Sequence, residues 1–215
     1  MNDTLLYLAE KFNLTWHEQT QIIEIPSATR KVMAEVLAET GLNTGVEVGV
    51  AQGYHAEILC QANPDILLHL VDPWHPYDGY NEYQDRITKY HLEAIERLEG
   101  YNCVFHQQFS MDAVKHFADN SLDFVYIDAA HDFKNVAMDM CEWTKKVRVG
   151  GIVFGHDYKR RNHNNDKYIV QVKDVAQAYM YAHGIRPWFV LGTQGNRGEG
   201  LSWMFVRQES DVLKV

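Results

Sequence analysis

Short apolar runs alternate with amphipathic stretches along most of the chain. The apolar runs cover residues 45–50, 66–71, 102–106, 122–127 and 152–154. After each run, apolar residues recur every three or four positions, as they do on the buried face of a helix. Strands that alternate with helices are typical of a parallel sheet with helices on both faces. The pattern therefore predicts an α/β fold.

Both ends of the chain depart from this alternation. Residues 1–40 read as two helices, with Ser27 as the capping residue of the second. Residues 188–191 and 201–206 are β-rich and flank a glycine-rich linker, which predicts an antiparallel hairpin. We expect a seven-stranded, mostly parallel sheet with this C-terminal hairpin. A helical leader over 1–40 would pack on a core of residues 41–215, and the two would form one globular domain.

A glycine-bearing turn follows the first predicted strand. The pattern is E-x-G-x-x-x-G, formed by Glu47, Gly49 and Gly53, and a helix-like stretch begins directly after it. Glycine allows a sharp turn at 49, and at 53 it would let a ligand approach the start of the helix. A dinucleotide fingerprint has a further glycine where this chain has Ala51. An NAD-linked oxidoreductase is therefore disfavoured.

Polar side chains follow the other predicted strands. Asp72 follows the second strand, Ser110 the third, Asp128 the fourth, and His156 and Asp157 the fifth. Ligands of open α/β sheets bind beyond the carboxyl ends of the strands, so these side chains should surround one crevice. A carboxylate at 72 suits ribose hydroxyls because it accepts several hydrogen bonds. The alternative for Asp72 is a structural cap of the turn.

The order of five βα units and a hairpin resembles the class I S-adenosylmethionine (SAM) dependent methyltransferases over about residues 40–207. The glycine turn is similar to motif I of that family. Residues 121–131 and 149–158 resemble the D-x-x-H and G-G-x-x-x-G-H-D-Y blocks of one branch. That branch is related to O-methyltransferases of catechols and antibiotic sugars. The resemblance implies methylation of a small-molecule oxygen, such as a sugar or phenol-like hydroxyl.

The resemblance also implies which residues bind SAM. The glycine turn would cradle the methionine end, Asp72 would hold the ribose, and Ser110 and Met111 would lie against the adenine ring. The full set implied is Glu47, Gly49, Gln52, Gly53, Asp72, Ser110, Met111 and Asp128.

A divalent cation is a second cofactor that the resemblance implies. In the catechol and sugar enzymes, acids after strands four and five hold magnesium, which lowers the pKa of the hydroxyl to be methylated. The matching positions are Asp128, His156 and Asp157. Magnesium prefers oxygen ligands, whereas a histidine suits manganese or zinc better. Without a metal, His131 or His156 would act as general base, so the catalytic candidates are Asp128, His131 and His156.

The charge and composition of the chain limit which binding partners are possible. The net charge of −9 argues against a large nucleic-acid interface, which needs a basic face. No apolar run approaches the length of a membrane span, and the first residues lack the basic segment of a signal peptide. We expect a cytoplasmic protein with a small-molecule acceptor, and a homo-oligomer is compatible with the sequence.

The sequence leaves three questions open. The first is whether the chain is an enzyme or a non-catalytic SAM-fold scaffold subunit. The second is whether an enzyme of this fold methylates a small molecule or a macromolecule, and the third concerns the aromatic residues after the second strand. The aromatic residues Trp74, Tyr77 and Tyr80 either line an acceptor pocket or pack the following helix onto the sheet.

Overall fold

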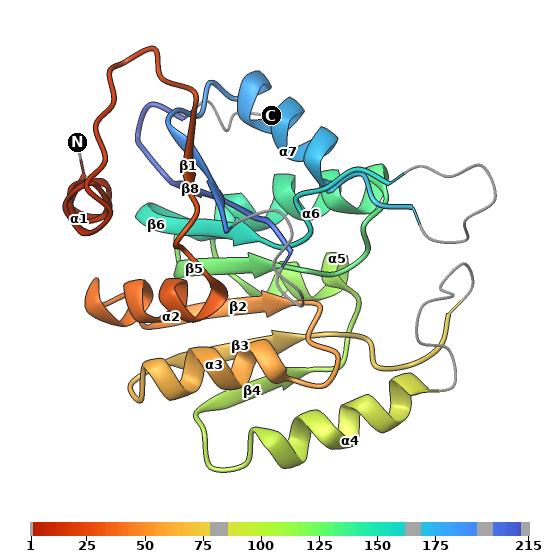
Figure 1. The fold of residues 1–215 in the computed structure, drawn as a ribbon. Helices are drawn as coiled ribbons and strands as arrows, with labels where there is room; N and C mark the ends of the chain where they lie inside the picture. The colour runs from red at the N-terminus through yellow and green to blue at the C-terminus, as the bar shows by residue number, and fades with distance from the viewer. Residues whose placement is uncertain (1, 78–85, 162–168, 193–199, 212–215) are drawn as a thin grey trace.

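The computed structural model in Figure 1 describes residues 2–77, 86–161, 169–192 and 200–211. Its helices are α1 (Asp3–Lys11), α2 (Arg30–Glu39), α3 (Tyr54–Ala62), α4 (Ile87–Arg97), α5 (Ser110–Ala113), α6 (Phe133–Lys146) and α7 (Val172–Ala182), with a 3₁₀ turn, η2 (Val114–His116), after α5. Its strands are β1 (Ile22–Ile25), β2 (Thr44–Val48), β3 (Leu67–Val71), β4 (Cys103–His106), β5 (Leu122–Ile127), β6 (Val147–Gly155), β7 (Trp188–Leu191) and β8 (Ser202–Val206).

The described strands form one sheet in the order β1-β7-β8-β6-β5-β2-β3-β4. Neighbouring strands are parallel except at β8, which runs antiparallel to both β6 and β7. The predicted mostly parallel sheet with a C-terminal hairpin is therefore confirmed. The linker that was expected to join the hairpin lies mostly outside the described residues.

Helices cover both faces of the sheet (Figure 1). One apolar cluster joins α2 and α3 to the sheet and includes Phe124, and a second joins α6 and α7 to it and includes Val125. These neighbours in β5 point to opposite faces, as successive strand residues do. Because both faces are covered, β5 reads as a nearly continuous apolar run. No described helix has the combination of length and apolar character needed to cross a bilayer.

The number of strands differs from the seven that the sequence predicted. The eighth strand is β1, which lies between the two predicted leader helices and pairs in parallel with β7, from Ile22 beside Trp188 to Ile25 beside Leu191. It escaped prediction because it is four residues long and, at the edge of the sheet, buries only Ile25. As a consequence the hairpin does not form the edge of the sheet, and the leader is part of the sheet rather than a purely helical cover.

The start of α2 also differs from the prediction. Thr29, not Ser27, is the N-cap, and its Oγ1 accepts a hydrogen bond of 3.2 Å from the Val32 amide. This places Arg30 as the first residue of the helix.

The carboxyl ends of the central strands are held together by backbone hydrogen bonds that continue past the strands. These bonds run from Gly49 N to Val71 O (2.9 Å), from Asp128 N to Val48 O (2.8 Å) and from His156 N to Ile127 O (3.2 Å). The predicted site residues that follow β2, β3, β5 and β6 are consequently held at one edge of the sheet.

Packing explains both glycines of the turn. Gly49 has φ 88°, and a Cβ there would lie 2.2 Å from the Asp128 carbonyl oxygen. Gly53 has φ 77°, and its open side faces α4, where a Cβ would lie 3.1 Å from Leu98 Cδ1. The sequence predicted that the missing side chain at Gly53 makes room for a ligand. In the structure α4 packs into that space instead.

A buried hydrogen-bond network joins α5 to α6. The Ser110 hydroxyl donates to the Asp139 carboxylate and accepts a hydrogen bond of 2.8 Å from Trp143 Nε1. Burial raises the pKa of Asp139 from its ordinary 3.8 to about 7, although the hydrogen bond from Ser110 lowers it. This network fixes the position of Ser110 at the end of β4.

We expect Gly49→Ala to destabilise the protein by several kcal/mol more than Gly41→Ala. Both glycines have positive φ, but a Cβ at Gly41 would meet no atom within 4 Å. The Gly41 variant therefore pays only the backbone cost, about 1–2 kcal/mol. Urea unfolding followed by circular dichroism measures the free energy of unfolding of each variant. Equal losses of stability in the two variants would show that the contact between residue 49 and Asp128 does not add to the cost.

Asp139 should make the protein less stable as the pH rises from about 4 to about 7. In this window the folded state keeps a proton on Asp139 that the unfolded chain releases, because the pKa is about 7 when folded and 3.8 otherwise. The contribution is a slope of up to about 1.4 kcal/mol per pH unit. Unfolding free energies between pH 4.5 and 7.5 should therefore fall more steeply for the wild type than for Asp139→Asn. Parallel curves would refute the assignment.

Candidate active site

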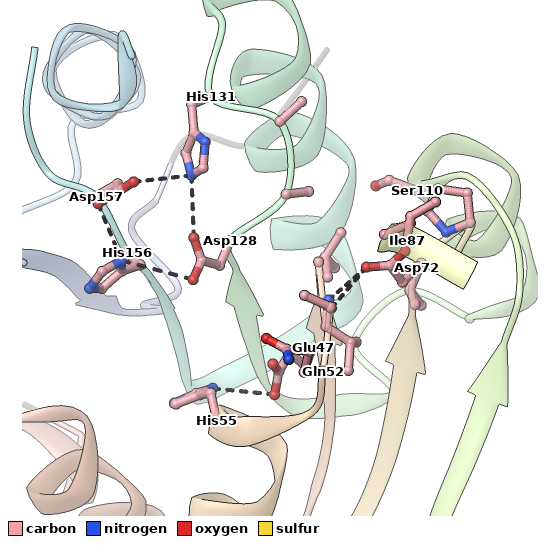
Figure 2. Close-up of a pocket in the computed structure, with 18 of the residues that line it drawn as sticks. Glu47, Gln52, His55, Asp72, Ile87, Ser110, Asp128, His131, His156 and Asp157 are labelled. Atoms are coloured by element: carbon pink, nitrogen blue, oxygen red, sulfur yellow. Dashed lines mark hydrogen bonds and ion pairs between the residues drawn. The ribbon is translucent and has the colours of Figure 1, made fainter. Parts of the chain in front are cut away.

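A cavity of about 330 Å³ lies where β2, β3, β5 and β6 end (Figure 2). Nine of the residues singled out in the sequence line it: Glu47, Gly49, Gln52, Asp72, Ser110, Asp128, His131, His156 and Asp157. They come from segments far apart in the sequence and converge because parallel strands end at the same edge.

Two residues of the implied SAM set lie elsewhere. Gly53 packs against α4, and Met111 packs against the apolar cluster on the α6 side of the sheet. Gln52 lines the cavity, but its side-chain amide donates to Glu93 of α4 at 2.5 Å.

Asp72 caps the glycine turn. Its Oδ2 accepts hydrogen bonds from the amides of Val50 (3.1 Å) and Ala51 (3.0 Å), and its Oδ1 accepts one from Trp74 (2.8 Å). Burial raises the pKa of Asp72, while these amide hydrogen bonds lower it. A carboxylate accepts about four hydrogen bonds, so Asp72 keeps capacity for about one more. The structural alternative for Asp72 is thus realised, and one ligand hydroxyl still fits beside it.

A buried acid and a histidine form another part of the cavity wall. Glu47 and His55 are 2% and 5% exposed, and Glu47 Oε2 lies 3.2 Å from His55 Nδ1. The His55 ring also stacks on Tyr126, with the ring centroids 3.8 Å apart. Burial raises the pKa of Glu47, and the charges of His55 and Arg30 lower it. Neither Arg30, which precedes every motif, nor His55 was singled out from the sequence.

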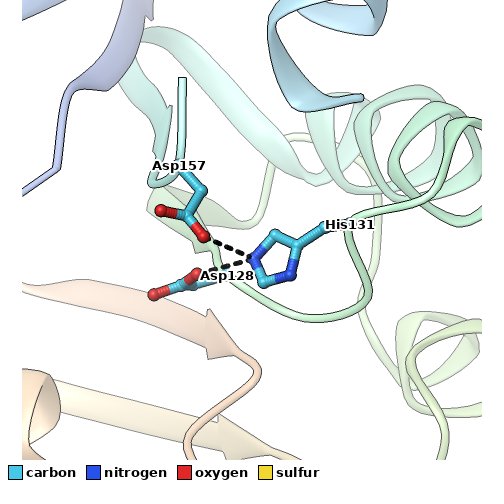
Figure 3. A group of neighbouring side chains, drawn as sticks. All are labelled: Asp128, His131 and Asp157. Atoms are coloured by element: carbon cyan, nitrogen blue, oxygen red, sulfur yellow. Dashed lines mark hydrogen bonds and ion pairs between the residues drawn. The ribbon is translucent and has the colours of Figure 1, made fainter. Parts of the chain in front are cut away.

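A second cluster joins two carboxylates through a histidine (Figure 3). His131 Nε2 lies 3.3 Å from Asp128 Oδ1 and 3.4 Å from Asp157 Oδ2. One ligand atom from each residue falls within 4.8 Å of the others, which is close enough to surround a metal ion. Two carboxylates and an imidazole suit a borderline divalent cation better than magnesium.

His156 lies on the other side of the same two carboxylates. Its Nδ1 is 3.3 Å from Asp157 Oδ1 and 3.9 Å from Asp128 Oδ2, and its buried Nε2 has no hydrogen-bond partner among the described residues. The sequence matched His156 to the metal ligands, whereas the structure places His131 between the two acids. Spacing could not separate these roles, because both histidines follow strand ends.

Asp157 is held as a carboxylate by its surroundings. Burial raises its pKa, but hydrogen bonds from His156 and Lys159 and the charge of His131 outweigh burial, so that the pKa lies well below its usual range. Lys159 Nζ approaches Asp157 Oδ1 at 2.8 Å. A negative charge is therefore maintained at this edge of the cavity.

The aromatic residues after β3 divide between the two expected roles. Trp74 packs α4, because its ring stacks on His91 with centroids 4.5 Å apart. Tyr77 lines the cavity and meets Phe109 edge-on at 5.1 Å. Tyr80 lies outside the described residues.

Comparison with known proteins supports a common fold. An O-methyltransferase from Bacillus cereus, solved in complex with S-adenosylhomocysteine (SAH), is 19% identical with a TM-score of 0.62, over 96% of this chain and 92% of that chain. The O-methyltransferase TomG from Streptomyces achromogenes, involved in tomaymycin synthesis and solved with SAM, is 17% identical with a TM-score of 0.60, over 96% and 91%. The N-methyltransferase NodS from Bradyrhizobium japonicum WM9 is 13% identical with a TM-score of 0.58, over 84% and 95%.

These identities establish the fold alone, and the named enzymes methylate different atoms. No curated protein matches the sequence. A family model described as a methyltransferase domain matches residues 46–158, which is more than half of the chain. The match runs from the glycine turn through Asp128 and His131 to Asp157. The resemblance seen in the sequence is thus confirmed, and the chain belongs to the methyltransferase domain family.

Proposed function

We propose that this protein is a SAM-dependent methyltransferase that methylates an oxygen of a small molecule, such as a sugar or phenol-like hydroxyl. The observation that carries the proposal is the convergence of the glycine turn, Asp72 and the Asp128–His131–Asp157 cluster on one cavity. A volume of about 330 Å³ is within the range of small-molecule sites.

The cavity fits SAM chemically. Asp72 keeps capacity for about one ribose hydroxyl, and Ser110 marks the end where the adenine would lie. His55 lines the cavity, and its buried Nε2 has no hydrogen-bond partner among the described residues. When bound, SAM supplies an electrophilic methyl group on a positively charged sulfonium. Glu47, Asp72, Asp128 and Asp157 place negative charge around such a cation.

The geometry favours His156 as the general base. Its Nδ1 is oriented by Asp157 at 3.3 Å. Its Nε2 is buried beside Gly200 and bonds to no described residue, so it would take the proton of an acceptor hydroxyl that reaches it there. A carboxylate behind an imidazole stabilises the positive charge that the ring acquires when it takes a proton. Removing that proton turns the hydroxyl into the stronger nucleophile that methyl transfer requires.

Asp128, His131 and Asp157 are the residues that would hold a divalent cation. A cation held there would act as a Lewis acid, which would orient the acceptor and lower the pKa of its hydroxyl. We favour His131 over His156 as the third ligand, because its Nε2 lies within 3.4 Å of an oxygen of each acid.

The alternatives differ in what they require of the cavity. A scaffold subunit needs neither the paired acids nor an oriented histidine at 156. A nucleic-acid substrate is disfavoured by the net charge of −9. The cytoplasmic location, the division at residue 40 and a homo-oligomer stay predictions.

The cofactor is tested by calorimetric titration with SAH, with NAD as the comparison ligand. We expect micromolar binding of SAH and none of NAD, because the turn lacks the glycine that admits a pyrophosphate. Binding of NAD without SAH would contradict the proposal. Binding of SAH without turnover on any hydroxylated acceptor, with and without divalent metals, would favour the scaffold alternative.

The metal site is tested with Mn²⁺, whose unbound form is measured by electron paramagnetic resonance. The wild type should bind about one equivalent, and Asp157→Asn and His131→Asn should each weaken binding at least tenfold. Glu142→Gln, which removes a surface carboxylate paired with Lys145, is the control. His156→Asn should keep the metal and lose turnover. Loss of metal in His156→Asn but not in His131→Asn would reverse the two roles.

A further inference from the structure

Arg30 is a cavity residue from outside the motif region. It is the first residue of α2 and lines the cavity together with Glu47 and His55. Among the described lining residues it is the one Lys or Arg side chain, against the carboxylates of Glu47, Asp72, Asp128 and Asp157. Its position in the leader means that the cavity wall is completed by a segment that precedes every sequence motif.

The charge of Arg30 has no anionic partner among the described residues. No described carboxylate forms an ion pair with it. The Tyr126 hydroxyl is a hydrogen-bond neighbour of the guanidinium, but the Nε is buried without a hydrogen-bond acceptor among the described residues. Glu47, whose pKa it lowers, is already bonded to His55 at 3.2 Å. A buried guanidinium nitrogen without an acceptor costs free energy, and guanidinium groups pair well with carboxylates through two parallel hydrogen bonds. An anion in the cavity would supply the acceptor that the buried Nε of Arg30 lacks.

His55 lines the same part of the cavity as Arg30 and Glu47, and it also has an unused hydrogen-bonding atom. His55 is 5% exposed, uses Nδ1 for Glu47, and leaves Nε2 buried without a described partner. When Nδ1 donates to Glu47, the neutral ring has an acceptor at Nε2. A guanidinium beside an imidazole acceptor suits a zwitterion, in which a carboxylate and an ammonium are attached to the same carbon.

We propose that Arg30 binds the α-carboxylate of the methionyl part of SAM, with His55 beside the α-ammonium. The proposal rests on the proposed function, because SAM is the ligand that the cavity would hold. The α-carboxylate is the one anionic group of SAM, so it is the group that an unpaired cation in this cavity would select. Glu47 and His55 also lie apart from the Asp128–His131–Asp157 cluster, where the acceptor would react (Figure 2). The anion is therefore assigned to the cofactor rather than to the acceptor.

The test compares two ligands that differ in this carboxylate. SAH carries it, and decarboxylated SAH lacks it but keeps the adenosine, the sulfur and the amine. Calorimetry should show that Arg30→Gln weakens SAH binding by about 10- to 100-fold, as expected for loss of a charge-assisted hydrogen bond. Binding of decarboxylated SAH should change less than about threefold, and Arg30→Lys should recover part of the SAH affinity, because it restores the charge without the two-pronged geometry.

Lys31→Gln is the matched control, since it removes a charge from the next residue of the same helix, where the side chain is exposed. It should leave both affinities unchanged. Urea unfolding of all variants shows whether each one is folded at the titration temperature.

The proposal would be overturned if Arg30→Gln lowered the affinity for SAH and for decarboxylated SAH equally, or lowered neither affinity. An unchanged SAH affinity with a raised KM for an acidic acceptor would overturn it too, by assigning Arg30 to the acceptor. Failure of the wild type to bind either ligand would instead contradict the proposed function, so the two failures are distinguishable.

Discussion

The close approach of β2 and β5 determines where everything else in the site lies. The Asp128 carbonyl occupies the space that a side chain at 49 would need, and the Asp128 amide donates to Val48 at 2.8 Å. This contact exists only if residue 49 is glycine, and it brings the turn before α3 against the loop after β5. The cofactor turn and the acid–histidine cluster therefore share one cavity because of backbone packing, before any ligand is considered.

The charges around that cavity are kept in place by different means. Asp72 is fixed by three backbone amides, Glu47 by a buried histidine, and Asp157 by His156, Lys159 and His131. Each carboxylate thus has an orientation that does not depend on solvent. Preorganised charge of this kind is worth more in a cavity than in water, because the local dielectric is lower and little reorganisation is needed. An acid-rich wall with Arg30 at one place suits a ligand that is cationic at its reacting centre and anionic at one end.

Residues at strand ends were the part of the site that the sequence could predict. Each of Asp72, Asp128 and Asp157 follows an apolar run, and parallel strands bring such positions together regardless of the details of packing. The same logic located Ser110, but not its partner Asp139, which is buried inside an amphipathic helix and has no motif of its own. Arg30 was out of reach for a similar reason, because its place on the cavity wall depends on how α2 packs rather than on local sequence.

Other differences come from orientation, which spacing does not encode. His131 and His156 follow strand ends in the same way, yet one lies between the acids and the other beside them. Gly53 fits the glycine pattern, but its open side faces α4. The short strand β1 was missed because an edge strand with one buried residue has little apolar pattern to recognise.

Whether this cavity binds SAM can be seen in a crystal structure of the protein grown with SAH. We expect SAH in the cavity, with the adenine near Ser110, a ribose hydroxyl on Asp72 and the carboxylate on Arg30. SAH bound at another place, or bound here with the carboxylate directed away from Arg30 and toward the Asp128–His131–Asp157 cluster, would contradict it.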